Sequence, residues 1–380
     1  MLSGKPETMK EINKSLILET IRKNGPISRA NLNKLLDLSF PAISSNVNAL
    51  LEKGWIVETE KDSNKMGRKA TLLEYNGDKG CVIGVDIGRS HISVIMADVA
   101  GNELKQVSAY SPWTAGDELM RNTHRLLDET LNAVPNSREK LMCIAVGIPG
   151  YRDESDMKNI LAPFLEDWEN IDVEKELREA FKTEIRIDNS VNYSAIGEKW
   201  RGNARNCKDM LYLGFGVGIG SALILNGNLY RGNNGVAGEI GYSLPDYRMA
   251  RKEYSVEGVY ERIVTGRAGV SNGINNMKEV FEKADHGDLD ACALLESILH
   301  YTEVVLVNSI AMLNPEQVIF SGNIGKALLT RYREEISNFL RSPVPFVPKL
   351  EVSALGEKAG ALGAVAAALR CVHSGFTISE

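Results

Sequence analysis

Apolar residues recur at helical spacing through the first 55 positions of the chain. Their pattern predicts helices over residues 9–23, 29–36 and 40–53. Ser28 and Ser39 stand where N-caps are expected, directly ahead of the second and third helices. The expected buried faces are Met9, Ile12, Leu16 and Ile21 in the first helix, Ala30, Leu32, Leu35 and Leu36 in the second, and Ile43, Val47, Leu50 and Leu51 in the third. Two short helices joined by a three-residue turn are typical of a helix-turn-helix unit.

A β-hairpin is expected directly after the three helices. Residues 55–59 and 70–75 predict two strands, joined by a polar loop that contains Gly67, Arg68 and Lys69. A hairpin with a basic tip behind a helix-turn-helix unit is a wing. Residues 1–75 are therefore expected to form a winged helix-turn-helix domain that binds DNA.

Several side chains of this head suit nucleic acid. The exposed face of the third helix carries small polar groups that suit base edges in a major groove, and Asn48 suits adenine. Arg68 and Lys69 suit a minor groove or phosphates, and Arg29 at a helix start suits a phosphate. The candidate DNA-binding residues are Arg29, Ser39, Phe40, Pro41, Ser44, Ser45, Asn48, Gly67, Arg68 and Lys69. A winged helix that contacts a protein instead of DNA is the alternative.

Beyond residue 80 the pattern changes to short apolar strands that alternate with helices. Such alternation predicts an α/β body whose sheets are mostly covered. A helix is expected to end at Trp200, and an Ala- and Gly-rich one to cover 356–369. The hairpins at 81–97 and 210–225 repeat one pattern, which suggests an internally duplicated body with a cleft between two lobes. The expected strands are 81–88, 92–97, 141–148, 184–188, 210–213, 222–225 and 317–320, the last closed by 321–325.

A glycine-rich run, 214–242, is the most distinctive stretch of the body. Alternate glycines between its two strands leave bare backbone, whose N–H groups can turn toward a ligand oxygen. Further along, Glu239 stands between Gly238 and Gly241. This arrangement indicates a loop that holds an oxygen-rich small molecule, with Glu239 accepting hydrogen bonds from its hydroxyl groups. A glycine-rich hairpin without a ligand is the alternative.

Composition and charge narrow the possible classes. A chain of 380 residues with 43% apolar and 25% charged residues predicts two or three globular domains. Residues 1–75 hold 12 Lys+Arg and 9 Asp+Glu, a net +3, whereas the whole chain carries −6, so the rest carries −9. Only the head is therefore expected to meet a polyanion. No 18-residue apolar run and no secretory signal is present, so a membrane span is not expected.

Five scattered cysteines without a C-x-x-C pair argue against a disulfide framework and a sulfur-rich zinc site. Cys81, Cys143 and Cys292 lie in apolar surroundings and are expected to be buried thiols. This cysteine usage favours a reducing cytoplasm.

Segments of the body, taken together with the head, resemble the ROK family (repressors, open reading frames and sugar kinases). The resemblance extends over residues 10–370, and a winged helix ahead of the body is the arrangement of the family's repressors. It implies an actin/hexokinase-like ATPase fold, with two α/β lobes around a sugar cleft. The implied lobes are 80–200, completed by a C-terminal helix at 356–372, and 201–355. The matching segments are VIGVDIGRSHISV at 82–94, GIPG at 147–150, IDNSVNYSAIGE at 187–198, GVGIGSALILNGNLYRGNNGVAGEIGY at 216–242 and ALGEKAGALGAVAAAL at 354–369.

The chain departs from the family's kinases at catalytic positions. The kinases carry an Asn-Asp pair, whose Asp is the general base, where this chain has Asn189-Ser190. Asp188 lies about 7 Å from Ser190 by strand rise and would substitute only if the sugar moved. Arg89 and Val217 replace a glycine and a threonine of the phosphate-binding loops. We therefore expect no catalytic residue, no enzyme activity and no cofactor.

The family's zinc ligands, one His and three Cys, are also replaced. Tyr242 stands at the His position, and the Cys positions fall in a stretch, 252–259, that contains no Cys. No metal is expected. Packing by Tyr242, Tyr254 and Tyr260 is expected to hold this region instead.

The positions that contact sugar in the family are partly kept. Carboxylates and an amide suit a polyol, because each accepts from a fixed hydroxyl. Phe164 and Tyr242 suit the apolar face of a sugar. The expected ligand is a neutral sugar, an amino sugar, or a sugar phosphate held by a residue such as Arg89; Glu239 and Glu261 with purely structural roles are the alternative. By resemblance the candidate sugar-binding residues are Pro149, Gly150, Asn189, Ser190, Glu239, Tyr242 and Glu261.

Together these features predict a sugar-responsive transcriptional regulator of carbohydrate genes, most simply a repressor. Its partners are expected to be a palindromic operator DNA and a sugar or sugar-phosphate effector, and its state a cytoplasmic homodimer or homotetramer. An active sugar kinase with a DNA-binding domain and a repressor without a ligand are the alternatives.

Overall fold

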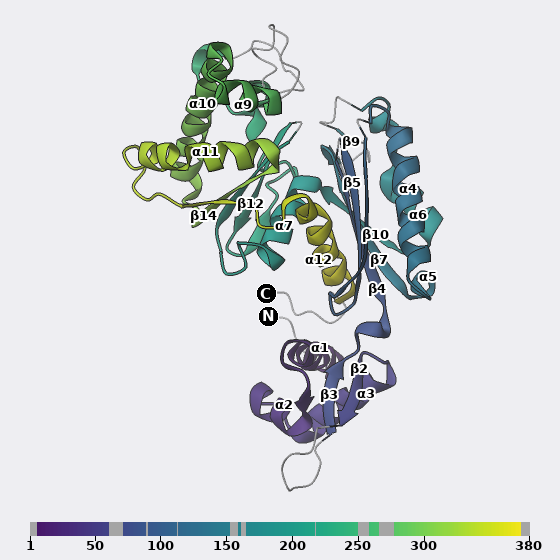
Figure 1. Ribbon diagram of the computed structural model, residues 1–380. Helices are drawn as coiled ribbons and strands as arrows, with labels where there is room; N and C mark the ends of the chain where they lie inside the picture. Colours follow the sequence, from purple (N-terminus) through teal and green to yellow (C-terminus); the bar gives the residue numbers. More distant parts are fainter. Residues whose placement is uncertain are drawn as a thin grey trace.

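The computed structural model describes residues 6–60, 71–88, 90–111, 113–152, 159–160, 165–216, 218–249, 258–265 and 277–373. It consists of a small head and a two-lobed body stacked end to end (Figure 1). Within these ranges no helix has the length and apolar character needed to cross a membrane. Several candidates of the sequence analysis lie outside the described residues: Gly67, Arg68, Lys69, Arg89, Phe164, Val217 and Tyr254.

The head has the three helices and the wing strands that the sequence predicts. Its sheet has the order β1-β3-β2, with antiparallel pairing throughout. Both predicted N-caps are present: the Ser28 hydroxyl accepts from the Asn31 amide at 3.2 Å, and the Ser39 hydroxyl from the Ala42 amide at 3.4 Å. The elements are α1 (Pro6–Asn24), β1 (Ile27–Ser28), α2 (Arg29–Leu36), α3 (Phe40–Glu52), β2 (Ile56–Glu60) and β3 (Thr71–Tyr75).

The predicted buried face of the first helix is wrong in part: Ile21 is buried as expected, but two of its other residues are exposed. Met9 is 51% and Leu16 is 37% exposed, whereas Ile17 and Leu18 are buried. Three consecutive apolar residues, 16–18, cover about 200° of a helix, so spacing alone does not say which of them faces the core. Leu35 of α2 is also exposed.

The body contains two five-stranded sheets built to one plan. In each, a central strand pairs antiparallel with the next strand of the chain and parallel with a later one. The orders β10-β7-β4-β5-β6 and β15-β14-β11-β12-β13 correspond strand for strand, which confirms the predicted duplication. The bounds are β4 (Cys81–Ile87), β5 (His91–Asp98), β6 (Glu103–Tyr110), β7 (Leu141–Ile148) and β10 (Glu184–Asn189), then β11 (Met210–Phe215), β12 (Ile219–Leu225), β13 (Asn228–Tyr230), β14 (Gln317–Ser321) and β15 (Lys349–Val352).

Helices cover both faces of each sheet. On the first sheet, α4 (Gly116–Ala133) and α6 (Val173–Phe181) pack on the outer face, and α12 (Ala359–His373) packs on the inner face. On the second, α10 (Leu289–Leu313) and α11 (Gly322–Leu340) form the main apolar layer. Helix α7 (Ser190–Arg201) contributes to an apolar cluster with each sheet, so it lies between the lobes (Figure 1).

Smaller elements complete the body. The remaining bounds are α5 (Ser137–Lys140), β8 (Tyr151–Arg152), β9 (Asn159–Ile160), α8 (Val259–Val264) and α9 (Met277–Asp285). The residues expected to close the strand at 317–320 instead begin α11.

One cysteine prediction also fails. Cys81 and Cys143 are buried as expected, but Cys292 is exposed, because it lies on the solvent side of the first turn of α10. The third buried cysteine is Cys207, which was not predicted to be buried.

Candidate functional site

A cavity of about 690 Å³ lies between the two lobes. It opens at the carboxyl ends of the parallel strands β4, β7 and β10 from one sheet and β11, β14 and β15 from the other. Ligands of open α/β sheets bind at such strand ends. The cavity brings together all seven candidate sugar-binding residues, which come from four separate segments of the chain: Pro149, Gly150, Asn189, Ser190, Glu239, Tyr242 and Glu261.

Asn189 fixes the wall of the cavity that α7 begins. Its side-chain oxygen caps α7 by accepting from the Val191 amide at 2.7 Å, and its side-chain nitrogen donates to the Gly150 carbonyl at 2.6 Å. Gly150 has a φ of +75°, a conformation that favours glycine. One amide therefore holds a helix start and a neighbouring turn together, and its second N–H hydrogen can serve a ligand in the cavity.

Glu239 and Glu261 form the acidic end of the cavity. Burial, and next the negative charge of Glu261, raise the pKa of Glu239 to about 7. Among the described residues, no hydrogen bond reaches the Glu239 carboxylate. Bare backbone lets the glycine-rich loop approach the pair, since a Cβ on Gly218 would lie 2.4 Å from Glu261 Oε1. A ligand that donates hydrogen bonds to such a buried carboxylate stabilises its ionised form.

Another part of the cavity wall is organised by Asp86, which is 4% exposed. The Ser190 hydroxyl donates to Asp86 Oδ1, and His91 Nε2 lies 3.2 Å from Asp86 Oδ2. Burial opposes a charged ring at His91, but the hydrogen bond that the ring donates to Asp86 and the charges of Asp86 and Glu357 outweigh it and raise the pKa of His91. Both Asp86 oxygens are therefore engaged by side chains.

No role for Asp86 or His91 was predicted from the sequence. The available signal was an acidic residue at the end of a buried strand, followed five positions later by a His. Three further residues that line the cavity were not predicted from the sequence either: Asn323, Lys326 and Glu357. Tyr110 Oη donates to Glu357 Oε2 at 2.8 Å, so strand β6 contributes to this rim.

Asp188 does not line the cavity, which answers the question of a substitute base. Its carboxylate accepts from Asn192 Nδ2 at 2.7 Å and from Arg231 Nη2 at 2.6 Å. It is thus paired with a cation, Arg231, which follows strand β13. Among the described residues, no three His, Cys, Asp or Glu side chains gather as metal ligands would.

In the head, α3 presents most of its candidate residues to solvent. Phe40 is 53% exposed, Pro41, Ser45 and Asn48 are exposed, and Ser44 is half-buried. The Ser39 hydroxyl serves as the helix cap.

Arg29 has partners within the head. Its Nη2 lies 2.9 Å from Glu58 Oε1 in β2 and 3.4 Å from Asn48 Oδ1 in α3. The guanidinium therefore bridges the wing and the exposed helix and orients the amide of Asn48. The sequence predicted that Arg29 contacts a phosphate, and its role in orienting Asn48 was not predicted.

Comparisons with known proteins agree with this architecture. Residues 82–370 match the model of the ROK family, and residues 11–57 match a winged helix-turn-helix DNA-binding model. The xylose repressor of Caldicellulosiruptor bescii is 28% identical, over 96% of both chains. A glucokinase of Halalkalibacterium halodurans is 27% identical over 74% of this chain and 92% of its own.

A crystal structure described as a ROK family transcriptional regulator, a homolog of the E. coli MLC protein, superposes with a TM-score of 0.75. It is 20% identical and covers 97% of this chain and 98% of its own. The α/β fold with a winged helix-turn-helix ahead of a two-lobed body is thereby confirmed. The chain belongs to the ROK family and carries a winged helix-turn-helix DNA-binding domain in front of the family's body.

Proposed function

We propose that this protein is a sugar-responsive repressor that binds operator DNA through its head and a sugar in the cavity between its lobes. The carrying observation is Ser190, which stands where the family's kinases have their general base and donates its hydroxyl to Asp86. A hydroxyl cannot take a proton from a sugar at neutral pH, and both Asp86 oxygens already accept side-chain hydrogen bonds. The body therefore binds its ligand without phosphorylating it.

The charges around the cavity favour an uncharged sugar. Four carboxylates line it among the described residues, and Lys326 is the only lysine or arginine there. His91 is committed to Asp86. A sugar phosphate would bring its negative charge close to Glu239 and Glu261, whereas hydroxyl groups would donate to them. The relative from Caldicellulosiruptor bescii is described as a xylose repressor, which makes xylose the first sugar to test.

In this proposal each expected domain has its own binding function. Residues 1–75 bind the operator, and the lobes 80–200, with the helix at 356–372, and 201–355 close on the sugar. Two copies of the chain place two heads on a palindromic site, because helix-turn-helix proteins read symmetric half-sites. A 100-fold loss of operator affinity on sugar binding requires about 2.7 kcal/mol of coupling between the two sites.

The test is a thermal-shift screen of the purified protein against xylose, glucose, N-acetylglucosamine and their phosphates. We expect an unphosphorylated sugar to raise the Tm, and operator binding measured in parallel to weaken. ATP-dependent phosphorylation of the same sugars is assayed beside it and is expected to be absent. A protein that no sugar stabilises would contradict the proposal.

An active kinase is the second candidate, because a carboxylate does touch the Ser190 hydroxyl and the glucokinase relative shares the body. Turnover that survives Asp188→Asn but is lost with Ser190→Ala would establish this alternative and exclude a purely binding body.

A further inference from the structure

Helix α12 reaches the cavity with its first turn. The segment ahead of it and its start, Gly356, Glu357 and Gly360, line the cavity. Gly360 lies directly against the carboxylate of Asp86, since a Cβ there would be 2.3 Å from Asp86 Oδ2. The start of α12 therefore has no room to move independently of the group that holds Ser190 and His91.

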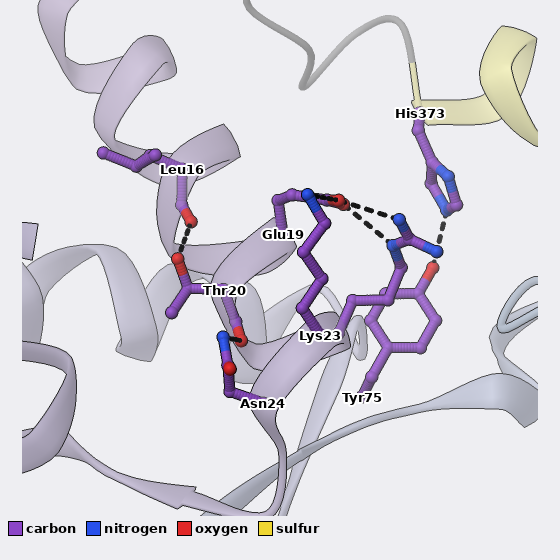
Figure 2. A network of polar contacts seen from close by, with 8 residues as sticks. Leu16, Glu19, Thr20, Lys23, Asn24, Tyr75 and His373 are labelled. Carbon is purple, nitrogen blue, oxygen red and sulfur yellow. Dashed lines mark hydrogen bonds and ion pairs between the residues drawn. The ribbon is translucent and has the colours of Figure 1, made fainter. Parts of the chain in front are cut away.

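The last turn of the same helix reaches the head. Tyr75 Oη and His373 Nε2 are 2.7 Å apart, and Figure 2 shows the two side chains meeting beside α1. The His373 ring also packs edge-on against Tyr75 and Trp55, with ring centroids 6.0 and 6.2 Å apart. Val372 packs against the apolar core of the head, which also includes Val99 of the body.

The surroundings of His373 keep it a neutral, packed group. Burial, and next the positive charge of Arg22, lower the pKa of His373 to about 4, although Glu19 opposes this. Glu19 and Arg22 are paired on α1 at 2.8 Å. An uncharged ring that hydrogen-bonds Tyr75 and packs on Trp55 is a specific contact with fixed geometry.

Between its ends α12 is a stiff element. It is buried along most of its length and packs against α7 so closely that a Cβ on Gly363 would lie within 2.8 Å of the Gly197 backbone. From Gly360 to His373 the helix spans about 20 Å. A displacement at the cavity end is therefore carried along the axis to the head end.

We propose that α12 couples the cavity to the DNA-binding head, and that His373 and Tyr75 are the residues that position the head on it. This coupling is the regulatory part of the proposed function and rests on that function for its sugar dependence. The contact itself is tested without any sugar.

The sugar-free test is a double-mutant cycle read by hydrogen exchange of head amides in the full chain. Gly360→Ala pushes α12 away from Asp86 and is expected to speed exchange in α1 and β3 at least threefold. In the His373→Ala background, Gly360→Ala is expected to raise the exchange rate of the same amides by less than a further twofold. Residues this far apart normally act additively, so additive effects, or a head unaffected by Gly360→Ala, would overturn the proposal. Asp86→Asn perturbs the same contact should Gly360→Ala fail to fold.

Milder variants separate positioning from folding. Tyr75→Phe keeps the ring and removes only the hydroxyl, and His373→Gln keeps a hydrogen-bonding group. We expect Tyr75→Phe to reproduce the loss of coupling and His373→Gln to restore part of it. Tyr230→Phe, on the exposed edge strand β13, is the matched control and is expected to change nothing.

The second arm adds xylose as the probe. In the wild type, we expect xylose to slow exchange at the start of α7 and to alter exchange in the head. In Tyr75→Phe the protection at α7 is expected to remain while the head no longer responds. Protection at α7 with an unresponsive wild-type head would refute the coupling. Absence of protection at α7 would instead count against xylose as the effector, and the double-mutant cycle would still decide the coupling.

Discussion

Glu239 makes the affinity for a sugar depend on pH in the neutral range. Its carboxylate is buried in the cavity beside Glu261, and its pKa is raised to about 7. If hydroxyl groups of the sugar donate to it, the ionised form is the one that binds. Lowering the pH from 8 to 6 protonates Glu239 and should weaken binding.

The size of the effect follows from the pKa. A group with a pKa near 7 is about 91% ionised at pH 8 and about 9% ionised at pH 6, so the affinity should fall about tenfold. The same shift sets the stability of the free protein. Because the folded pKa lies above the unfolded value of 4.5, the stabilising contribution is complete below pH 4.5 and is lost as the pH rises through 7. Glu239→Gln should therefore stabilise the free protein at pH 8, by up to about 3 kcal/mol.

The assay is titration calorimetry with xylose at pH 6, 7 and 8, together with thermal unfolding of the free protein. Glu239→Gln should bind weakly and without a pH dependence in this range, and Glu261→Gln should move the transition to lower pH, because the neighbouring negative charge is removed. Glu296→Gln, on the exposed side of α10, is the control. Wild-type affinity that is equal at pH 6 and 8, or stronger at pH 6, would refute the reasoning.

Three further variants test other parts of the molecule. Replacing Arg68 and Lys69 by Ala should weaken operator binding and reduce its salt slope by about two, and an unchanged slope would remove the wing from the interface. Arg29→Ala should weaken operator binding with little change in that salt slope, because its guanidinium pairs with Glu58. A slope reduced by about one would instead show that Arg29 contacts a DNA phosphate. Glu198→Gln should lower the Tm and the free energy of unfolding, the latter by about 2 kcal/mol. The reason is that this fully buried carboxylate accepts hydrogen bonds from both chain segments that connect the lobes, at Asn203 and at Ser353 and Leu355. An unchanged Tm would mean that neutral hydrogen bonds suffice there.

Local signals in the sequence predicted the head and most of the strands. Ser28 and Ser39 marked the helix starts correctly, because an N-cap is decided by the residue and its next three neighbours. The face of α1 was not predictable in the same way, since Leu16, Ile17 and Leu18 differ only in what packs against them. Strand β6 was missed because its exposed, mostly polar residues carry no apolar run.

The candidate site was predictable in its membership but not in its pairings. Glu239 was identifiable from its glycine neighbours, yet its raised pKa depends on its burial and, next, on Glu261, which helix α8 supplies. The bond between Ser190 and Asp86 joins residues 104 positions apart. Such contacts come from how distant segments of the chain pack together within each lobe, and no local pattern records that geometry.

The two buried carboxylates of the cavity, Asp86 and Glu239, differ in a way that argues for binding without reaction. Asp86 is buried but satisfied, since Ser190 and His91 occupy both of its oxygens. Glu239 is buried beside a like charge, and among the described residues nothing donates to it. A buried carboxylate without donors lowers the stability of the free protein, and a polyol that supplies hydroxyl groups relieves that cost. The free energy available for ligand binding therefore lies at Glu239, whereas the groups at the position of proton transfer, Ser190 and Asp86, are already joined by hydrogen bonds within the protein.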